Sequence, residues 1–203
     1  MVSLFKLYYN QGTFGLDALG IFSAFGLSAS AGLNAYIPLL VVAFLAKFTN
    51  LIHLSSPYDA LTSWWAIGVL LFLSLIEFFA DKIPAVNHIN DIIQTVIRPA
   101  AGAIAFAASA HVLTDMHPVV SIILGLIVAG GVHAVKAVAI RPAVTAATAG
   151  AGNVPVSILE DLTSTVVSIL SVVVPVIIAC LLIVLTAWII LLIWRRAHRL
   201  SKA

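Results

Sequence analysis

Ionisable side chains stand in three small groups inside runs of residues that are otherwise apolar. The groups are Glu77, Asp81 and Lys82; His133, Lys136 and Arg141; and Glu160 with Asp161. An ionisable residue at membrane depth costs roughly 2.5–3.5 kcal/mol on insertion scales and is usually functional. A carboxylate such as Glu160 or Asp161 can exchange a proton or a cation while a basic partner compensates its charge. The pattern favours acidic and basic pairs around a polar cavity over the alternative of charges at helix ends in the headgroup layer.

The segment between Pro84 and Pro99 carries a second polar pattern. Its polar residues, which include Asp91 and Arg98, follow the i, i+3/i+4, i+7 spacing, and isoleucines and valines fill the other face. This spacing predicts an amphipathic helix of about three turns. Such a helix either lies in the membrane interface or turns its polar stripe toward a wet cavity.

The stretch from Gly26 to Asn34 combines glycines with Ser28 and Ser30 inside an apolar run. We expect an interrupted helix here, because irregular polar backbone at membrane depth must line protein or water. Stripes of glycine, alanine and serine elsewhere in the chain are typical of close helix packing. They are also compatible with a homo-oligomer.

Other kinds of chemistry lack their signatures. The sequence contains no HExxH, phosphate-binding loop, GxGxxG or GxSxG pattern. An intramembrane hydrolase that uses Ser28 with His133 is disfavoured, because the glycine expected two residues after the serine is Ser30. The single cysteine, Cys180, excludes a disulfide framework and a four-cysteine metal site. We therefore predict no enzymatic activity, no bound metal and no cofactor.

The composition identifies the environment in which these residues act. Of 203 residues, 62% are hydrophobic and only 9% are charged, with a mean hydropathy of +1.15. A soluble domain carries about 25% charged residues, and a disordered chain is far less hydrophobic. The lipid bilayer is therefore the expected partner. A net charge of +2 without a basic face argues against nucleic-acid binding.

The apolar runs outline the expected fold, since a spanning helix needs about 20 mainly apolar residues. We predict an all-α polytopic membrane helix bundle in one domain over residues 1–203, with about six transmembrane helices, interrupted or re-entrant segments, and one amphipathic helix. Prolines such as Pro99, Pro142 and Pro175 should mark the joints, where a missing N–H costs least. The runs are Leu16–Ala31, Leu33–Phe48, Leu61–Ala80, Ala100–Leu113, Pro118–Ala139, Val154–Val174 and Pro175–Trp194.

The ends of the chain carry the orientation signal. Four basic residues follow the last run, and an excess of basic residues marks the cytoplasmic side, so we expect a cytoplasmic C-terminus. The N-terminal segment resembles a signal peptide, but Asp17 interrupts its apolar core, and we expect it to be retained. The four basic residues are Arg195, Arg196, Arg199 and Lys202.

A weak internal repeat is a further hypothesis. The tetrapeptide Ile-Arg-Pro-Ala occurs at Ile97–Ala100 and again at Ile140–Ala143. Inverted repeats are common in transporters, although short matches also arise by chance in a chain rich in alanine, glycine, proline and isoleucine.

Two motifs carry a resemblance to a known family. They are Gly-Leu-Ser-Ala-Ser-Ala-Gly-Leu-Asn-Ala-Tyr-Ile-Pro, which ends at Pro38, and Glu77-x3-Asp81-Lys82-Ile83-Pro84. With the looser second-half pattern, the chain resembles a family of bacterial multi-pass inner-membrane proteins known only as a domain of unknown function. The resemblance covers nearly the whole chain and differs in the longer segment Val144–Gly152. It implies an inner-membrane protein and supplies no activity.

Three hypotheses of function follow. The leading one is a small transporter or channel-like permease for a small solute or ion, with the charged groups, the Asp91–Arg98 stripe and the Gly26–Asn34 segment lining its pathway. The second is a non-transporting membrane scaffold or accessory subunit in which the charges are structural pairs. The third, which we disfavour, is an intramembrane enzyme.

Overall fold

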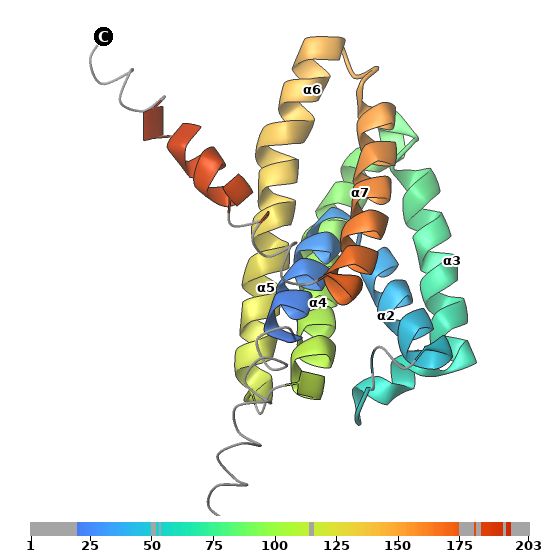
Figure 1. Cartoon of the computed structure of the whole chain (residues 1–203). Coiled ribbons are helices and arrows are strands. Elements are labelled where there is room, and N and C mark those ends of the chain that lie inside the picture. Colours follow the sequence, from blue (N-terminus) through green and yellow to red (C-terminus); the bar gives the residue numbers. More distant parts are fainter. Residues whose placement is uncertain are drawn as a thin grey trace, which may run out of the picture.

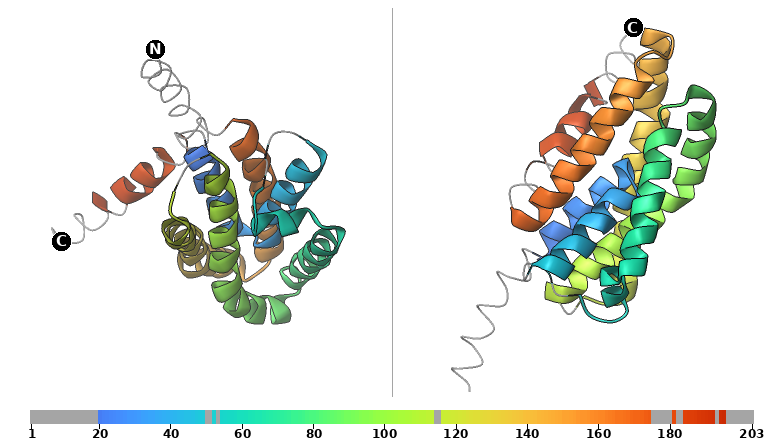
Figure 2. Two further views of the ribbon diagram at one scale, coloured as in Figure 1. Left: turned by 90° about the horizontal axis from the view of Figure 1, so that it is seen from below. Right: turned by 90° about the vertical axis from the view of Figure 1, so that its right-hand side faces the viewer.

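The computed structural model describes residues 20–49, 52, 54–113, 116–174, 181, 184–192 and 194–195. These residues fold into helices and connecting turns, with no strand among them, which confirms the all-α prediction. The long helices run alongside one another as a bundle (Figure 1), and two further views show the same arrangement (Figure 2).

Two short helices form a hairpin inside this bundle (Figure 1). The first described helix, Gly20–Leu33, packs Ala24 against Phe106, near the end of α4. The second, α2 (Tyr36–Phe48), brings Phe48 beside Trp64 at the start of α3. At 1.5 Å per residue the 13 residues of α2 span about 20 Å, short of the roughly 30 Å hydrocarbon core. Both arms therefore return to the same end of the bundle.

The helix break in the Gly26–Asn34 segment is shorter than the sequence predicts. Gly26–Gly32 is regular helix, and the break is confined to Asn34 and Ala35. The glycines and serines of the segment serve close packing instead, since Ser28, Ser30 and Ala31 are fully buried among neighbouring helices.

After the short helix η1 (Tyr58–Thr62), α3 covers Trp64–Ala80 and α4 covers Pro84–Leu113. The predicted separate amphipathic helix before Pro99 is wrong, because α4 continues through this proline into the apolar run. A proline inside a helix loses one backbone hydrogen bond. Packing compensates for this loss, because the Pro99 ring lies against Gly130 of α5. A Cβ atom built on Gly130 would lie 3.6 Å from the Cγ atom of Pro99.

The second expected break, at Pro142, is also absent. Helix α5 (Pro118–Val135) continues through the π-helical turn η2 (Lys136–Ile140) into α6 (Arg141–Thr148). The chain then reverses at Ala149 and Gly150, both with positive φ, and enters α7 (Asn153–Val173).

Helices α4 and α5 pack closely through glycines. A Cβ atom at Gly125 would lie 2.5 Å from the carbonyl oxygen of Gly102, so neither position has room for a side chain. The hydroxyl of Ser28 donates to the carbonyl oxygen of Gly125 at 2.9 Å and ties the hairpin to this contact.

Three of the described helices are long and apolar enough to cross a membrane: Ile89–Ser109, Pro118–Thr148 and Asn153–Val173. Large apolar side chains such as Phe72, Ile127 and Leu162 are exposed, whereas many charged and hydroxyl side chains are buried. This inverted distribution indicates a membrane protein. The total of about six crossings stays a prediction, and Pro175 and most of the chain's basic C-terminal residues lie outside the described residues.

Candidate functional site

The site begins at the break between the two arms of the hairpin. Asn34 is buried there, and its side-chain Oδ1 accepts hydrogen bonds from the backbone N–H groups of Tyr36 and Ile37, both at 3.1 Å. Its Nδ2 donates to Asp161 Oδ1 at 2.9 Å. One asparagine therefore caps the start of α2 and fixes the hairpin tip to α7.

Lys136 joins this tip to the acidic residues. Its Nζ donates to the carbonyl oxygen of Leu33 at 3.1 Å and lies 2.8 Å from Glu160 Oε2. The ammonium thus stands at the C-terminal end of the first helix, where the helix dipole favours a positive charge. In transporters with discontinuous helices, unwound backbone and helix C-terminal ends hold coupling cations at comparable positions.

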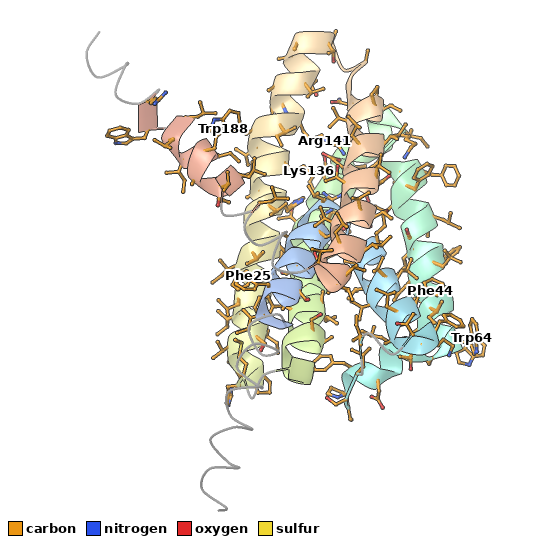
Figure 3. All side chains as sticks on the ribbon, in the orientation of Figure 1. Phe25, Phe44, Trp64, Lys136, Arg141 and Trp188 are labelled. Carbon is orange, nitrogen blue, oxygen red and sulfur yellow. The ribbon has the colours of Figure 1, made fainter. Side chains whose placement is uncertain are left out.

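The π-helical turn η2 places Arg141 beside Lys136. The Arg141 N–H donates to the Lys136 carbonyl oxygen, an i→i−5 bond that widens the turn. In an ordinary α-helix, residues five apart point in different directions, whereas the wider turn aligns them. Arg141 Nη2 consequently lies 2.6 Å from Glu160 Oε2, the same oxygen that pairs with Lys136. Figure 3 shows both basic side chains in the upper part of the bundle.

Arg98 lies at the middle of α4 and is fully buried. Its Nη2 donates to Glu77 Oε1 at 2.9 Å, and its Nη1 lies 3.2 Å from Nδ1 of His133. Arginine only donates, so this nitrogen of His133 accepts and carries no proton. The other ring nitrogen, Nε2, lies 3.1 Å from the Thr95 hydroxyl, which already donates to a backbone carbonyl. The imidazole is therefore neutral, with its proton on Nε2.

Asp81, one residue beyond α3, is the centre of the cluster. Asn90 Nδ2 donates to its Oδ1 at 2.7 Å. Burial by itself raises the pKa of this carboxyl, but nearby positive charges and the Asn90 bond outweigh it and hold the pKa below its usual value. Its Oδ2 lies near three basic side chains: Lys136 at 4.0 Å, Arg98 at 3.8 Å and Arg141 at 3.2 Å.

The repeated Ile-Arg-Pro-Ala tetrapeptide supplies two of these bases. Arg98 pairs with Glu77 and Arg141 pairs with Glu160, and both arginines also face Asp81. Each arginine precedes a proline inside a continuous helix. The two copies of the tetrapeptide thus have matching local roles, since each supplies an arginine to the same oxygen of Asp81.

A row of serines continues the polar face of α7 away from the cluster. Ser164 and Ser168 are fully buried, and both hydroxyls contact Ser30 Oγ, at 2.8 and 2.6 Å. At the other end Ser157 donates to Asp81 Oδ2 at 3.4 Å. The buried hydroxyls of α7 therefore bond to the ion cluster at one end and to the hairpin farther along the helix.

The structure brings most of the predicted residues together. Lys82 pairs with Asp161 at 3.5 Å at the edge of the cluster, and Asp91 lies near it without an ion pair to any described residue. Ser28 bonds to α5 and His133 to α4, so the disfavoured serine–histidine pair does not form. The central cluster consists of Glu77, Asp81, Arg98, His133, Lys136, Arg141 and Glu160.

Two contributors were missed from sequence. Asn90 bonds to Asp81, and Ser168 bonds to Ser30. Both had a signal, since Asn90 lies four residues before Gln94 on the polar stripe and Ser168 lies four after Ser164.

The chemistry of this arrangement is that of charge compensation. Oppositely charged side chains from several helices meet around a broken helix, so moving or neutralising one charge changes the stability of its neighbours. Fold and site together define a class: a helical bundle of membrane-spanning length with a buried ion cluster at its centre.

The chain belongs to the family described as Domain of unknown function (DUF4126), whose model matches residues 21–195. This confirms the family resemblance. No curated protein and no solved structure gives a match.

Proposed function

We propose that the protein is a small transporter or channel-like permease that moves a small solute or ion across a bacterial inner membrane. The observation that carries the proposal is the hairpin tip at Asn34, which ends inside the bundle against a cluster of buried charges. Broken helices that meet at mid-membrane are the usual binding sites of secondary transporters. The basic residues that begin at Arg195 favour a cytoplasmic C-terminus.

Shared ion pairs support a mechanism in which a carboxylate takes up a proton or a cation and a nearby basic side chain compensates the change in charge. Glu160 Oε2 binds both Lys136 and Arg141, and Asp161 binds Lys82 and Asn34. If one of these carboxylates takes up a proton or a cation, its basic partner loses an attraction and shifts toward another carboxylate such as Asp81. Uptake of one charge would then rearrange contacts between the hairpin, η2 and α7.

The experiment is a flux screen in proteoliposomes for ions and small metabolites, with electrical and pH readouts. Wild type is compared with the double variant Glu160→Gln/Asp161→Asn. A matched control is Ser121→Ala, which removes a buried hydroxyl on α5 that bonds to none of the described residues. We expect flux in wild type and the control and none in the folded double variant. Unchanged flux in the double variant would contradict the mechanism.

The second candidate is a non-transporting scaffold or accessory subunit. One observation favours it: four basic side chains of the cluster each have a carboxylate within 3.5 Å, as a structural ion network would. This function predicts a stoichiometric partner that co-purifies with the wild type and is lost when Glu160 or Lys136 is neutralised. Flux by the purified protein alone would argue against it.

A further inference from the structure

The charges of the central cluster and of its neighbours Lys82, Asp91 and Asp161, taken together, do not balance. His133 is neutral, because its Nδ1 accepts from Arg98. Among the described residues, five carboxylates therefore stand against four basic side chains, which leaves one negative charge in excess. They are Glu77, Asp81, Asp91, Glu160 and Asp161 against Lys82, Arg98, Lys136 and Arg141. An uncompensated charge in a buried site is costly and is relieved by neutralisation or by binding a cation.

The excess charge falls on Asp91. Each of the other four carboxylates forms an ion pair at 3.5 Å or less, whereas Asp91 forms none with the described residues. Its Oδ1 is buried and has no hydrogen-bond partner among the described residues. The charged groups that act on it are Arg98 on its own helix, Asp81 after α3, Lys136 in η2 and Arg141 in α6. Those bases are already paired with other carboxylates.

A second orphaned oxygen lies one turn away. Gln94 is 2% exposed, and its Oε1 also has no hydrogen-bond partner within the described part of the chain. Residues three apart on a helix are neighbours, with Cβ atoms about 5–6 Å apart. Two acceptors without a donor therefore share this face of α4. A proton on the Asp91 carboxylate would make it a hydrogen-bond donor, and Gln94 Oε1 would be the acceptor.

We propose that Asp91 is the proton-exchange site of this protein and that it holds one proton per chain, donated as O–H to Gln94 Oε1. In the exchange step an O–H bond forms on the carboxylate and one breaks in hydronium, which leaves water, and nothing is oxidised or reduced. Asp91 is two residues into the apolar span Ile89–Ser109, and its side chain is partly exposed, so a proton can reach it from outside the bundle.

This assignment deepens the proposed function, since it names the proton as the exchanged ion, and it differs from the expected sites. Glu160 and Asp161 are held by ion pairs and hydrogen bonds. Glu77 Oε2 is also without a partner, but its carboxylate is paired with Arg98 and is 1% exposed, away from water.

The test is infrared spectroscopy of the protein in lipid, in which a protonated carboxyl has its own C=O stretching band. We expect one such carboxyl per chain at neutral pH in wild type. The band should be absent from Asp91→Asn, present at a changed frequency in Asp91→Glu and Gln94→Leu, and unchanged in the matched control Asp59→Asn, which removes an exposed carboxylate outside the cluster. A helical circular dichroism spectrum verifies that each variant is folded.

Three outcomes would overturn the assignment: no band in wild type, a band that persists in Asp91→Asn, or a band that disappears in Glu77→Gln instead. Proton flux down a pH gradient is measured on the same preparations. The expected band without flux would support the proton site at Asp91 and contradict transport, so the two proposals fail separately.

Discussion

The pair formed by Arg98 and Glu77 allows a quantitative test of the ion cluster. Arg98 is the one basic side chain, among the described residues, within ion-pairing distance of Glu77, and the two are 0% and 1% exposed. Removing one partner of a buried pair leaves the other charge uncompensated and costs about 3–5 kcal/mol. Arg98→Met should therefore lower the free energy of unfolding by this amount.

A second substitution should restore stability. Glu77→Gln, added to Arg98→Met, removes the uncompensated charge, and we expect the double variant to recover about 2 kcal/mol of the stability lost in Arg98→Met alone. Free energies of unfolding are measured by denaturant titration in mixed lipid–detergent micelles. Arg195→Met is the control, because Arg195 is exposed and its loss should change stability by less than about 0.5 kcal/mol. A double variant less stable than Arg98→Met would refute the reasoning.

Further predictions concern packing, the hairpin tip and the serine row. Gly125→Ala should destabilise the bundle, because the added Cβ would lie 2.5 Å from a backbone oxygen. The control Gly131→Ala should leave stability unchanged, because no atom lies within 4 Å of its added Cβ. Thermal unfolding of the two variants compares them directly. Asn34→Ala should cost about 0.5–2 kcal/mol of unfolding free energy, the usual price of a lost helix cap, and a neutral result would show that the tip is held by other contacts. Ser30→Ala should cost about 1–3 kcal/mol in the same titration, because it leaves the Ser168 hydroxyl without its partner on the hairpin, whereas Ser164 still donates to the Ser30 carbonyl oxygen; an unchanged midpoint would contradict this.

The position of the site could be predicted from sequence because charges in apolar runs are rare. Glu77, Lys136 and Glu160 each stood out by residue type and spacing, and the structure places them in one cluster. Which charge pairs with which was not predictable, because it depends on how the helices cross. Asp91 illustrates this, since the sequence grouped it with Arg98 but only the contacts reveal that it forms no ion pair with the described residues.

The helix boundaries failed where packing overrides local preference. Pro99 and Pro142 predict breaks on local grounds, yet both lie inside continuous helices. At Pro99 the glycine of the facing helix accommodates the ring, and at Pro142 the chain forms a π-helical turn just before it. At Gly26–Asn34 the sequence predicts an interrupted helix, but the preceding glycines lie in regular helix and the break comes only at Asn34 and Ala35.

The proposed transport function requires the hairpin tip to lie on a pathway that admits water and solutes from outside the bilayer. Since the transported species is unidentified, the most direct measurement is one that does not require it: labelling of Asn34→Cys by a charged, membrane-impermeant thiol reagent in sealed vesicles, with the single Cys180 replaced by serine. Ala43→Cys on α2, which is equally buried but among apolar residues, is the control. We expect the cysteine at position 34 to react and the one at position 43 not to react. Equal protection of both cysteines would contradict a pathway and favour a purely structural ion cluster.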